Sequence, residues 1–404
     1  MLSRIKRFFT RKNGQVLDEI RNTQEDIKAG YKKLEKLMCA LDNKITSADK
    51  KFGSDIKSLG ARIDKRFEFT HNAMEQRNIS LRDKLIWLEK KIESLDRKTT
   101  RRFNNIDYFK KYDYYKNLNP GEYSLALKEW YKKRTEQELD LSNPQTYNEK
   151  MQWLKLYDGD PLKSKLADKY EVREWVKDKI GERYLIGLLG VWENYDDMNF
   201  DALPESFVLK CTHGCAWNLI VKEKGTIDHT DAKSKFDQWM NTNYAFFSLE
   251  LHYNDIRPKI IAEEYLENAD GGIYDYKIWC FDGKAEYIQF LSDRNTGLKM
   301  AFFDLEWNLL PFVYDYPRNE EPVSKPDNLD EMLRLAQTLA QGFCHVRVDF
   351  YRLNDGTLKF GEMTFSSAAG AAKWNPREYD LLLGQKITLP ENKSVRNCEG
   401  EIQS

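Results

Sequence analysis

The first hundred residues show a heptad pattern of apolar and polar positions. From Ile27 to Phe52 apolar side chains recur at alternating spacings of four and three, and after a change of phase the pattern resumes from Leu81 to Leu95. These spacings are those of positions a and d in a coiled coil. We therefore expect a helical coiled coil over residues 15–107, with a stutter or hinge between the two runs. Its apolar stripe must be covered, either by self-association with a second copy of the chain or by the helix folding back on the globular part of the chain.

Beyond Tyr108 the pattern becomes that of a globular domain in which helices and strands mix. Helical periodicity is found over residues 124–134, 146–156, 161–179 and 328–341. Strand-like apolar runs cover residues 184–187, 207–211, 219–221, 260–265, 274–281 and 284–291. Because the two kinds of element do not alternate strictly, they favour an α+β fold over a doubly wound sheet. We expect this domain to span residues 108–390 and to be followed by a loose polar tail at 391–404.

A hairpin is predicted near the end of this domain, where two alternating runs flank the Asn-Asp-Gly turn at residues 354–356. The period of two places Arg347 and Asp349 on one face of the first strand. On the second strand the same period groups three residues on one face: Phe360, Glu362 and Thr364. Asp349 and Glu362 are therefore expected to meet across the ladder. Two carboxylates on rigid strands beside an arginine suit a Mg²⁺ ion that bridges phosphate oxygens, and a solvated hairpin face is the alternative.

Composition narrows the classes of protein that the chain can belong to. Lysine and arginine together number 64 and aspartate and glutamate 65, so the net charge of −1 gives no global reason to expect nucleic acid as a partner. The six cysteines are scattered without a C-x-x-C pair, which is typical of a reduced cytosolic protein. No stretch resembles a transmembrane helix or the apolar core of a signal peptide. The basic segment 1–14 is either a frayed terminus or a contact with an anionic membrane surface.

The strand–loop–strand at residues 206–224 suits a polyphosphate. Lys210 ends its first strand, and the loop that follows contains His213 and Gly214. A loop between antiparallel strands can fold over phosphates and offer backbone N–H groups, while a lysine neutralises their charge. Cys211, His213 and Cys215 also raise the question of zinc. Their spacing is tight and no second ligand cluster accompanies them, so we do not expect a zinc site.

Three further patches are ambiguous when each is taken alone. The strand end at Glu263 and Glu264 can bind a flat heterocycle through its backbone and one carboxylate. Lys277 and Arg294 are cations within neighbouring strands, where solvent-facing cations are common. The third patch is a helical face with i, i+4 spacing that ordinary surface ion pairs explain equally well: Asp168, Lys169 and Arg173.

The order of these patches along the chain is more informative than any one of them. The patches lie in seven sequence segments: NPQTYNEKMQWLKLYD, ADKYEVREWV, LPESFVLKCTHG, RPKIIAEEYLEN, DYKIWCFDGK, VRVDFY and FGEMTFSSAAG. Together they resemble the ATP-grasp superfamily, and most closely its TupA-like branch, which is associated with bacterial cell-surface polysaccharide and teichuronopeptide assembly. The resemblance covers roughly residues 118–390 and leaves the expected coiled coil outside.

The resemblance implies a fold and an activity. The fold would be two α+β lobes that sandwich ATP. The activity would be that of an ATP- and Mg²⁺-dependent carboxylate–amine ligase, in which a carboxylate is phosphorylated to an acyl phosphate and an amine then attacks to form an amide. The setting would be capsule or other surface polysaccharide biosynthesis in the bacterial cytoplasm, at the inner face of the plasma membrane. The substrates would be a carboxylate-bearing sugar or glycan precursor and an amine or amino acid.

The resemblance also assigns roles by position. Lys169 and Lys210 would contact the phosphates of ATP beneath the loop that holds His213 and Gly214. Adenine would be read by three positions: Glu263, Glu264 and the backbone near Leu266. Mg²⁺ would be held by three others: Asp349, Glu362 and Thr364. Arg347 would stabilise the transferring phosphoryl group, while Lys277 and Arg294 would face the carboxylate substrate.

Two positions depart from the family pattern. Thr364 stands where many ATP-grasp enzymes have asparagine, although a hydroxyl can also ligate Mg²⁺. The phosphate-covering loop reads HGCAWN instead of a glycine-rich run, and the bulk of Trp217 bears on the mobility of this lid. A coiled-coil scaffold that binds nucleotide without turnover is therefore one alternative. A glycosyltransferase-like enzyme of the same pathway is the other.

Overall fold

The computed structural model describes residues 112–266, 274–292 and 298–391, several short pieces between 22 and 68, and the backbone of 395–396 and 402–403. The chain divides into two units, Met1–Arg102 and Phe103–Ser404. In the first unit the described residues, such as 32–37 and 64–66, are helical. Most of the predicted coiled coil and all of segment 1–14 lie outside the described residues, so the coiled coil stays a prediction.

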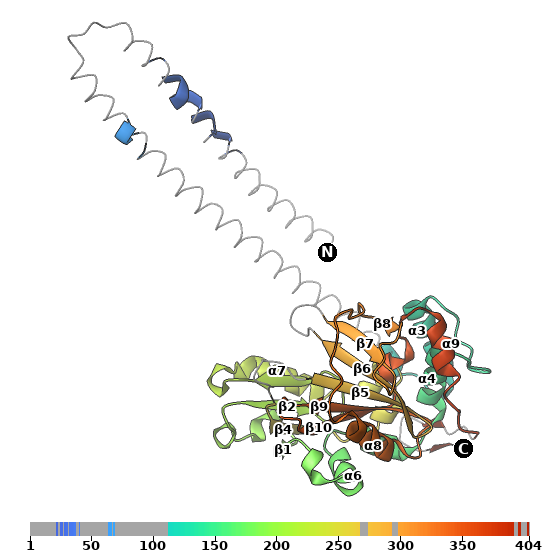
Figure 1. The fold of residues 1–404 in the computed structure, drawn as a ribbon. Helices are drawn as coiled ribbons and strands as arrows, with labels where there is room; N and C mark the ends of the chain where they lie inside the picture. Colours follow the sequence, from blue (N-terminus) through green and yellow to red (C-terminus); the bar gives the residue numbers. More distant parts are fainter. Residues whose placement is uncertain are drawn as a thin grey trace, which may run out of the picture. The chain divides into compact units, whose positions relative to one another are not determined.

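The second unit combines helices with antiparallel strands (Figure 1). Its described α-helices are α3 (Tyr123–Thr135), α4 (Tyr147–Tyr157), α5 (Pro161–Ala167), α6 (Val172–Lys179), α7 (His229–Met240), α8 (Leu329–Ala340) and α9 (Glu378–Gly384). Its longer strands are β1 (Leu188–Trp192), β2 (Phe207–Cys211), β3 (Asn218–Val221), β4 (Ile260–Glu264), β5 (Tyr274–Phe281), β6 (Lys284–Ser292), β7 (Lys299–Phe303), β9 (His345–Arg352) and β10 (Leu358–Thr364). Two-residue strands complete the described set: β8 (Val313–Tyr314), β11 (Trp374–Asn375), β12 (Val395–Arg396) and β13 (Ile402–Gln403).

Two antiparallel sheets organise this unit. One has four strands in the order β1-β4-β2-β3, and the other has five in the order β10-β9-β5-β6-β7. Helices lie between and around strands that pair out of sequence order, which confirms the α+β prediction. No helix in the described part of the chain has both the length and the apolar character that crossing a membrane requires.

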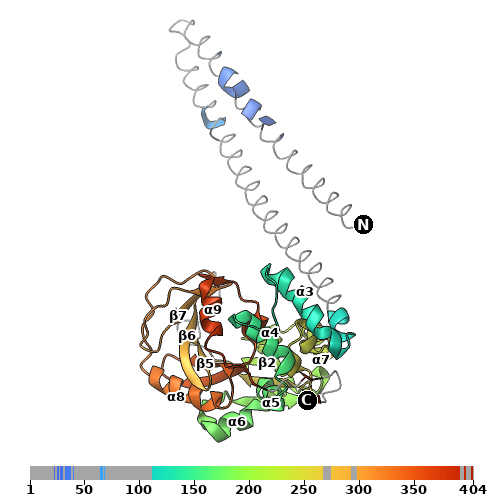
Figure 2. The same ribbon diagram turned by 90° about the vertical axis from the view of Figure 1, so that its right-hand side faces the viewer.

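The five-stranded sheet is covered on both faces. On one face α8 buries apolar residues at helical spacing: Leu329, Met332, Leu335, Ala336, Leu339 and Ala340. Burying each leucine side chain stabilises the fold by about 1.5–3 kcal/mol relative to leaving it in water. The opposite face packs around the fully buried Trp279 against α4 and α9, which Figure 2 shows next to each other. The four-stranded sheet has its own core, in which Phe236 of α7 packs with Phe207 and Leu209 of β2.

Local sequence explains where the elements begin and turn. Thr146 caps α4, because its hydroxyl accepts a hydrogen bond from the N–H of Glu149 at 3.2 Å while the Glu149 carboxylate accepts one from the N–H of Thr146 at 2.9 Å. The hairpin turn is present as predicted. In it the Gly356 N–H bonds the Leu353 carbonyl at 3.0 Å, and the φ of +83° at Gly356 suits glycine.

Two predictions about elements were wrong. The helix expected over residues 161–179 is broken, because the Asp168 carboxylate accepts hydrogen bonds from the N–H groups of Tyr170 and Glu171 at 2.7 and 3.2 Å and opens a new turn. The apolar run at 184–187 is buried in the core without forming a strand, and β1 begins only at Leu188. Beyond residue 390 the structure describes the short pair β12 and β13, and the loose tail stays a prediction.

Candidate active site

A row of polar side chains crosses four neighbouring strands of the five-stranded sheet. Gln289 of β6 pairs with Lys277 of β5, Lys277 pairs with Asp349 of β9, and Asp349 pairs with Glu362 of β10. Directly opposed residues in a sheet lie on the same face, so these four side chains project together. The predicted meeting of Asp349 and Glu362 is therefore confirmed, and Lys277 joins them.

A β-bulge creates this arrangement. The register of β9 and β10 runs from Phe360 opposite Phe350 to Glu362 opposite Asp349, so Gly361 is an extra residue. The prediction that Phe360 shares a face with Glu362 and Thr364 was wrong: Phe360 is 4% exposed within the core that α8 covers. Strict alternation would force either a phenylalanine out of the core or a glutamate into it. The bulge avoids both.

Arg347 and Lys277 neutralise Asp349. The Arg347 guanidinium contacts the two carboxylate oxygens of Asp349 at 2.7 and 2.8 Å, and the Lys277 Nζ donates to Oδ2. Asp275 lies 3.0 Å from the same lysine. Arg347 also reaches Glu362 at 3.2 Å and the Ser367 hydroxyl at 3.4 Å. The result is a compact network of charges on one sheet face.

Burial makes these charges interact strongly. Asp349 is 2% exposed and Lys277 is 9% exposed, whereas the side chain of Glu362 is 38% exposed. Burial alone favours the neutral form of Asp349, but Arg347 and then Lys277 outweigh it and hold the pKa of this carboxyl below its usual value. Burial likewise opposes the charge of Lys277, yet Asp349 and Asp275 raise its pKa above the usual value. Asp349 is thus an anion between two cations, and Glu362 is the more accessible acid.

The donor set suits Mg²⁺. Asp349, Glu362 and Thr364 offer carboxylate and hydroxyl oxygens, and the Thr364 hydroxyl lies 3.2 Å from Glu362. Magnesium prefers hard oxygen ligands and is commonly held by one or two carboxylates that it shares with phosphate oxygens. Among the residues that the structure describes, no cluster of three or more His, Cys, Asp or Glu side chains forms a metal cage. The two carboxylates and the hydroxyl are the residues that would hold such an ion.

A second ionic group lies on the four-stranded sheet. Glu263 of β4 receives Lys210 of β2 at 2.6 Å and Arg173 of α6 at 3.0 Å. All three side chains are largely buried, and Arg173 also donates to the Ile186 carbonyl at 2.7 Å. The pairing of β2 with β4 brings Lys210 and Glu263 together, a contact that the sequence did not indicate. Glu264 is exposed at the end of β4, and Leu266 lies half-buried just after it.

The loop between β2 and β3 is anchored at both ends. Its Gly214 carbonyl accepts a hydrogen bond from the Lys169 Nζ at 2.5 Å, so Lys169 lies beside this loop, and its contact with phosphates stays a prediction. Lys169 does so from the turn after Asp168, not from a continuous helical face. At the other end Trp217 is 9% exposed and packs against Trp239 and Tyr244. Gly214 lies against the Trp217 ring, where an added Cβ would collide with it.

Helix α4 holds the segment that follows β10. Asn148 bonds both the N–H and the carbonyl of Ala372, at 3.1 and 2.9 Å, and Gln152 and Lys155 bond the Ala369 carbonyl at 3.0 and 3.1 Å. This segment needs the support because Ala368 and Ala369 have φ values of 51° and 53°, which are unfavourable for alanine. It carries Ser367, the partner of Arg347.

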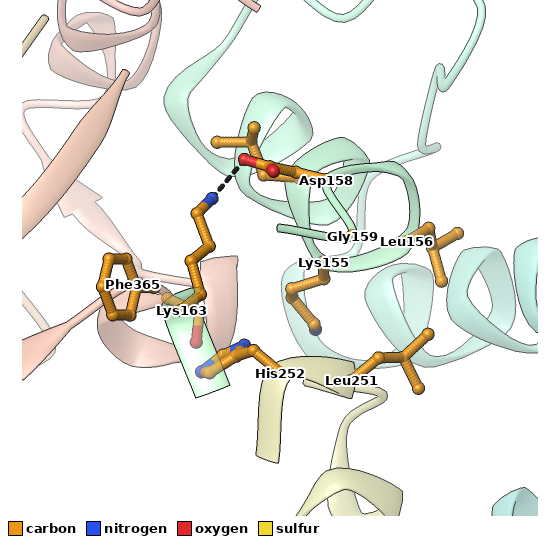
Figure 3. Close-up of a pocket in the computed structure, with 10 residues that line it drawn as sticks. Lys155, Leu156, Asp158, Gly159, Lys163, Leu251, His252 and Phe365 are labelled. Carbon is orange, nitrogen blue, oxygen red and sulfur yellow. Dashed lines mark hydrogen bonds and ion pairs between the residues drawn. The ribbon is translucent and has the colours of Figure 1, made fainter. Parts of the chain in front are cut away.

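A small enclosed cavity lies beside this segment (Figure 3). Lys163 points across it to Asp158, and Lys155, His252 and Phe365 also line it. Its volume of 10 Å³ has room for about one water molecule. Burial lowers the pKa of Lys155 to about 7. The cavity is too small to hold a substrate.

Several polar residues in and around the charge network were missed in the sequence analysis. Asp275 and Gln289 were not proposed, although Asp275 sits two residues before Lys277 and so shares its strand face. Glu250, which accepts hydrogen bonds from Ser366 and Ser248 at 2.5 Å each, had no sequence signal. Arg294 lies outside the described residues. Lys277, Arg347 and Asp349 are brought together, whereas Lys210 and Glu263 form the separate ionic group.

Comparison with known protein families agrees with this geometry. The family described as TupA-like ATPgrasp matches residues 149–388. The chain belongs to the TupA-like ATP-grasp family. The match contains every described site residue named above except Asn148, and it leaves out the first unit. Comparison with the curated proteins found no match.

Similarity to solved structures was also found for this TupA-like chain. D-alanine–D-alanine ligase from Bacillus anthracis complexed with ATP is 16% identical, with 54% of this chain and 63% of that chain covered and a TM-score of 0.31. The ADP complex of purK, N5-carboxyaminoimidazole ribonucleotide synthetase, is 12% identical, with 50% and 45% covered and a TM-score of 0.30. The ligase PsnB with minimal precursor, Mg and ADP is 13% identical, with 52% and 53% covered and a TM-score of 0.28. The chain thus spans between about half and two thirds of each of these proteins.

Proposed function

We propose that this chain is an ATP-dependent carboxylate–amine ligase that uses Mg²⁺. The observation that carries the proposal is the alignment of Lys277, Asp349 and Glu362 on three adjacent strands, with Arg347 bound to both acids. Cations and carboxylates held on one rigid sheet face suit phosphoryl transfer, which depends on positioning and on charge stabilisation. Membership of the ATP-grasp family supports the same reaction class.

The reaction we propose has two steps. An oxygen of the substrate carboxylate attacks the γ-phosphorus of ATP, the bond to the bridging oxygen breaks, and ADP leaves. The amine nitrogen then attacks the acyl carbon, phosphate leaves with the bonding electron pair, and the nitrogen loses a proton. The products are an amide, ADP and phosphate.

The residues divide this work between them. Arg347 and Lys277 stabilise negative charge on the transferring phosphoryl group and on the substrate carboxylate. Asp349, Glu362 and Thr364 are the residues that would hold Mg²⁺, which supplies charge neutralisation at phosphate oxygens. Lys169 and Lys210 bind phosphates next to the loop of Gly214. Glu264 and Leu266, at the end of β4, are residues that would bind adenine.

The assay for this proposal measures both products. The full chain with Mg²⁺-ATP, a glucuronic-acid acceptor and mixed amines is expected to release ADP and phosphate only when both substrates are present. Asp349→Asn and Glu362→Gln are each expected to lower that release by at least about 100-fold, the scale of losing a group that stabilises transition-state charge. ADP release that both substitutions leave untouched would overturn the proposal.

The setting we propose is bacterial cell-surface polysaccharide biosynthesis, with a carboxylate-bearing sugar or glycan precursor as acceptor. This setting rests on the family's association with cell-surface polysaccharide assembly, and no single residue supports it by itself. We place the enzyme in the cytoplasm at the inner membrane face, and self-associated through the predicted coiled coil. Light scattering on the full chain and on a chain lacking residues 1–107 tests the last point, because equal monomeric masses would refute self-association.

One observation favours a second candidate, a scaffold that binds ATP without turnover. Trp217 is buried against Trp239 and fixes the loop that would have to move over the phosphates. In addition, Lys210 is engaged by Glu263 and Lys169 by the Gly214 carbonyl. ATP binding without release of ADP under any acceptor and amine would select this candidate.

A further inference from the structure

Glu250 is a buried acid to which the proposed reaction gives no role. It is 6% exposed and lies in the connection between α7 and β4, outside the five-stranded sheet. One of its carboxylate oxygens accepts a hydrogen bond from the Ser248 hydroxyl and the other accepts one from the Ser366 hydroxyl, each at 2.5 Å. In the described part of the chain no cation forms an ion pair with it. A carboxylate that is buried with hydroxyl partners alone is costly, which indicates that the bond to Ser366 does more than fill space.

Ser366 begins the strained turn that follows β10. Ala368 and Ala369 in this turn have left-handed φ values of 51° and 53°, which are unfavourable for alanine. Helix α4 holds the far end of the turn through the Ala369 carbonyl. Glu250 holds its beginning from a different part of the chain. The turn is therefore fixed at both ends, and Ser367 lies between the two fixed points.

Ser367 is the contact between this turn and Arg347. A guanidinium has five N–H donors. Nε and Nη2 of Arg347 donate to Asp349 at 2.7 and 2.8 Å, and Nη2 also donates to Glu362 at 3.2 Å. Nη1 contacts the Ser367 hydroxyl at 3.4 Å, and its second N–H has no partner among the described residues. This N–H is the donor that Arg347 can offer to a transferring phosphoryl group, and Ser367 bears on its direction.

Electrostatic effects also place Glu250 beside the charge network. Burial first, and then the carboxylates of Glu250 and Glu362, raise the pKa of the Tyr253 hydroxyl. The two acids therefore act on the same phenol, although they come from distant parts of the chain. Glu250 thus lies next to the network without being one of the acids that would bind Mg²⁺.

We propose that Glu250 is a positioning residue for phosphoryl transfer. By fixing Ser366 it holds Ser367 against Nη1 of Arg347, and so keeps the remaining N–H of that nitrogen directed at the transferring group. Glu250 itself contacts neither substrate nor metal in this role. The inference rests on the proposed function, because it adds a residue to the machinery of the same reaction.

Ser366 and Ser248 offer a matched test, because each donates one hydroxyl at the same distance to the same carboxylate. The measurement is ADP release by the full chain with Mg²⁺-ATP, the glucuronic-acid acceptor and mixed amines. Ser366→Ala should lower kcat about tenfold and leave the KM for ATP unchanged, since a misplacement of about 1 Å can cost up to roughly 100-fold in rate. Ser248→Ala, the control, should lose a similar amount of thermal stability and keep the original kcat. Ser366→Thr retains the hydroxyl and should keep most of the rate.

A double substitution tests whether Ser366 acts through Ser367. Ser367→Ala should lower kcat as Ser366→Ala does. The double variant should be no slower than Ser367→Ala alone, because both changes break the same series of contacts. Losses that add in full would show that Ser366 acts by another route and would overturn the proposal.

A second readout does not require turnover. The NMR signal of the Arg347 Nε–H group in the full chain without ATP, identified by its loss in Arg347→Lys, should shift in Ser366→Ala and stay in place in Ser248→Ala. If that shift is absent, or if the two serine variants lower kcat equally, the positioning role is wrong even where the ligase stands. If the unsubstituted chain releases no ADP with any acceptor and amine, the ligase is wrong, and a shift confined to Ser366→Ala would still show that the bond to Glu250 holds Arg347 in place.

Discussion

Glu362 lies directly opposite Asp349 because Gly361 adds one residue to β10. A Cβ at Gly361 would lie 3.2 Å from the Asp349 carbonyl oxygen and 3.3 Å from the Tyr351 ring. The bulge therefore places the acids and also limits the residue that can form it. Asp349 and Glu362, which are expected to share one ion, are therefore aligned by Gly361, a residue that has no side chain to take part in the reaction.

Gly361→Ala is expected to disturb the site more than the fold. The tight contact should lower the free energy of unfolding by about 1–3 kcal/mol, the usual cost of overpacking. Mg²⁺-dependent ADP release should fall further than this stability loss explains, since the ladder must shift at Asp349. Gly356→Ala in the turn of the same hairpin is the control, because its φ of +83° costs about 1–2 kcal/mol without touching either acid. Equal losses of activity in both variants would contradict this account.

The two acids should differ sharply in their effect on stability. Asp349→Asn leaves Arg347 and Lys277 buried without their main counter-ion, which should cost about 3–5 kcal/mol in urea unfolding at pH 7. Glu362→Gln removes a half-exposed partner and should cost less than about 1 kcal/mol. The depressed pKa of Asp349 means that its contribution is present above the unfolded carboxyl pKa and is lost as the pH falls through the folded value. Similar costs for the two variants would refute the asymmetry.

Trp217→Ala tests whether this ring fixes the loop. The substitution should cost about 3–5 kcal/mol, as expected for deleting a buried aromatic side chain. Amide hydrogen exchange of residues 212–216 should accelerate in the native state, because the contacts with His213 and Tyr244 are lost. Ile220→Ala in β3, where the side chain is 59% exposed, provides the control. Unchanged exchange in the Trp217 variant would show that the loop is held by other contacts.

His345 should make stability depend on pH. Burial lowers its pKa to about 3, its Nδ1 lies 2.9 Å from the Cys280 carbonyl, and its Nε2 lies 3.1 Å from the Tyr147 hydroxyl. Between about pH 6.5 and pH 3 the unfolded chain binds a proton that the folded chain does not, so stability falls by about 1.4 kcal/mol per pH unit as the pH is lowered.

His345→Gln removes this titration, so the stability difference between the two proteins should change by that slope across the window. Burial also raises the pKa values of Asp168 and Asp380 to about 6, which contributes a slope of opposite sign in both proteins and cancels in the comparison. A constant difference from pH 6 to pH 4 would refute the role of His345.

Strands and their faces were predictable because apolar alternation reports burial directly. The hairpin, β2 and β5 follow their predicted spans, and Asp349 meets Glu362 as expected. The bulge was not predictable, since a single glycine within an alternating run leaves the period unchanged on either side. The error about Phe360 has this cause.

The pairing of strands that are distant in the sequence was the second feature that could not be predicted. Lys277 meets Asp349 only because β5 pairs with β9, 72 residues further along the chain, and Lys210 meets Glu263 through β2 and β4. Such contacts depend on sheet order, which periodicity does not encode. The break at Asp168 had a local signal, because aspartate favours helix N-caps and turns. The i, i+4 spacing of Lys169 and Arg173 suggested a continuous helical face instead.

The bonds between α4 and the segment after β10 have a consequence for how the chain is made. Asn148 and Ala372 are 224 residues apart, and Asn148 also bonds Asp380. When α4 leaves the ribosome, its amide side chains have none of these partners, and the left-handed turn that they stabilise does not yet exist. A nascent chain therefore holds no finished site until nearly the whole second unit has been synthesised. Any fragment that ends before Ala372 is expected to leave the buried apolar residues of α4, such as Met151 and Leu154, without their complete packing, and exposed apolar surface makes such a fragment prone to aggregation.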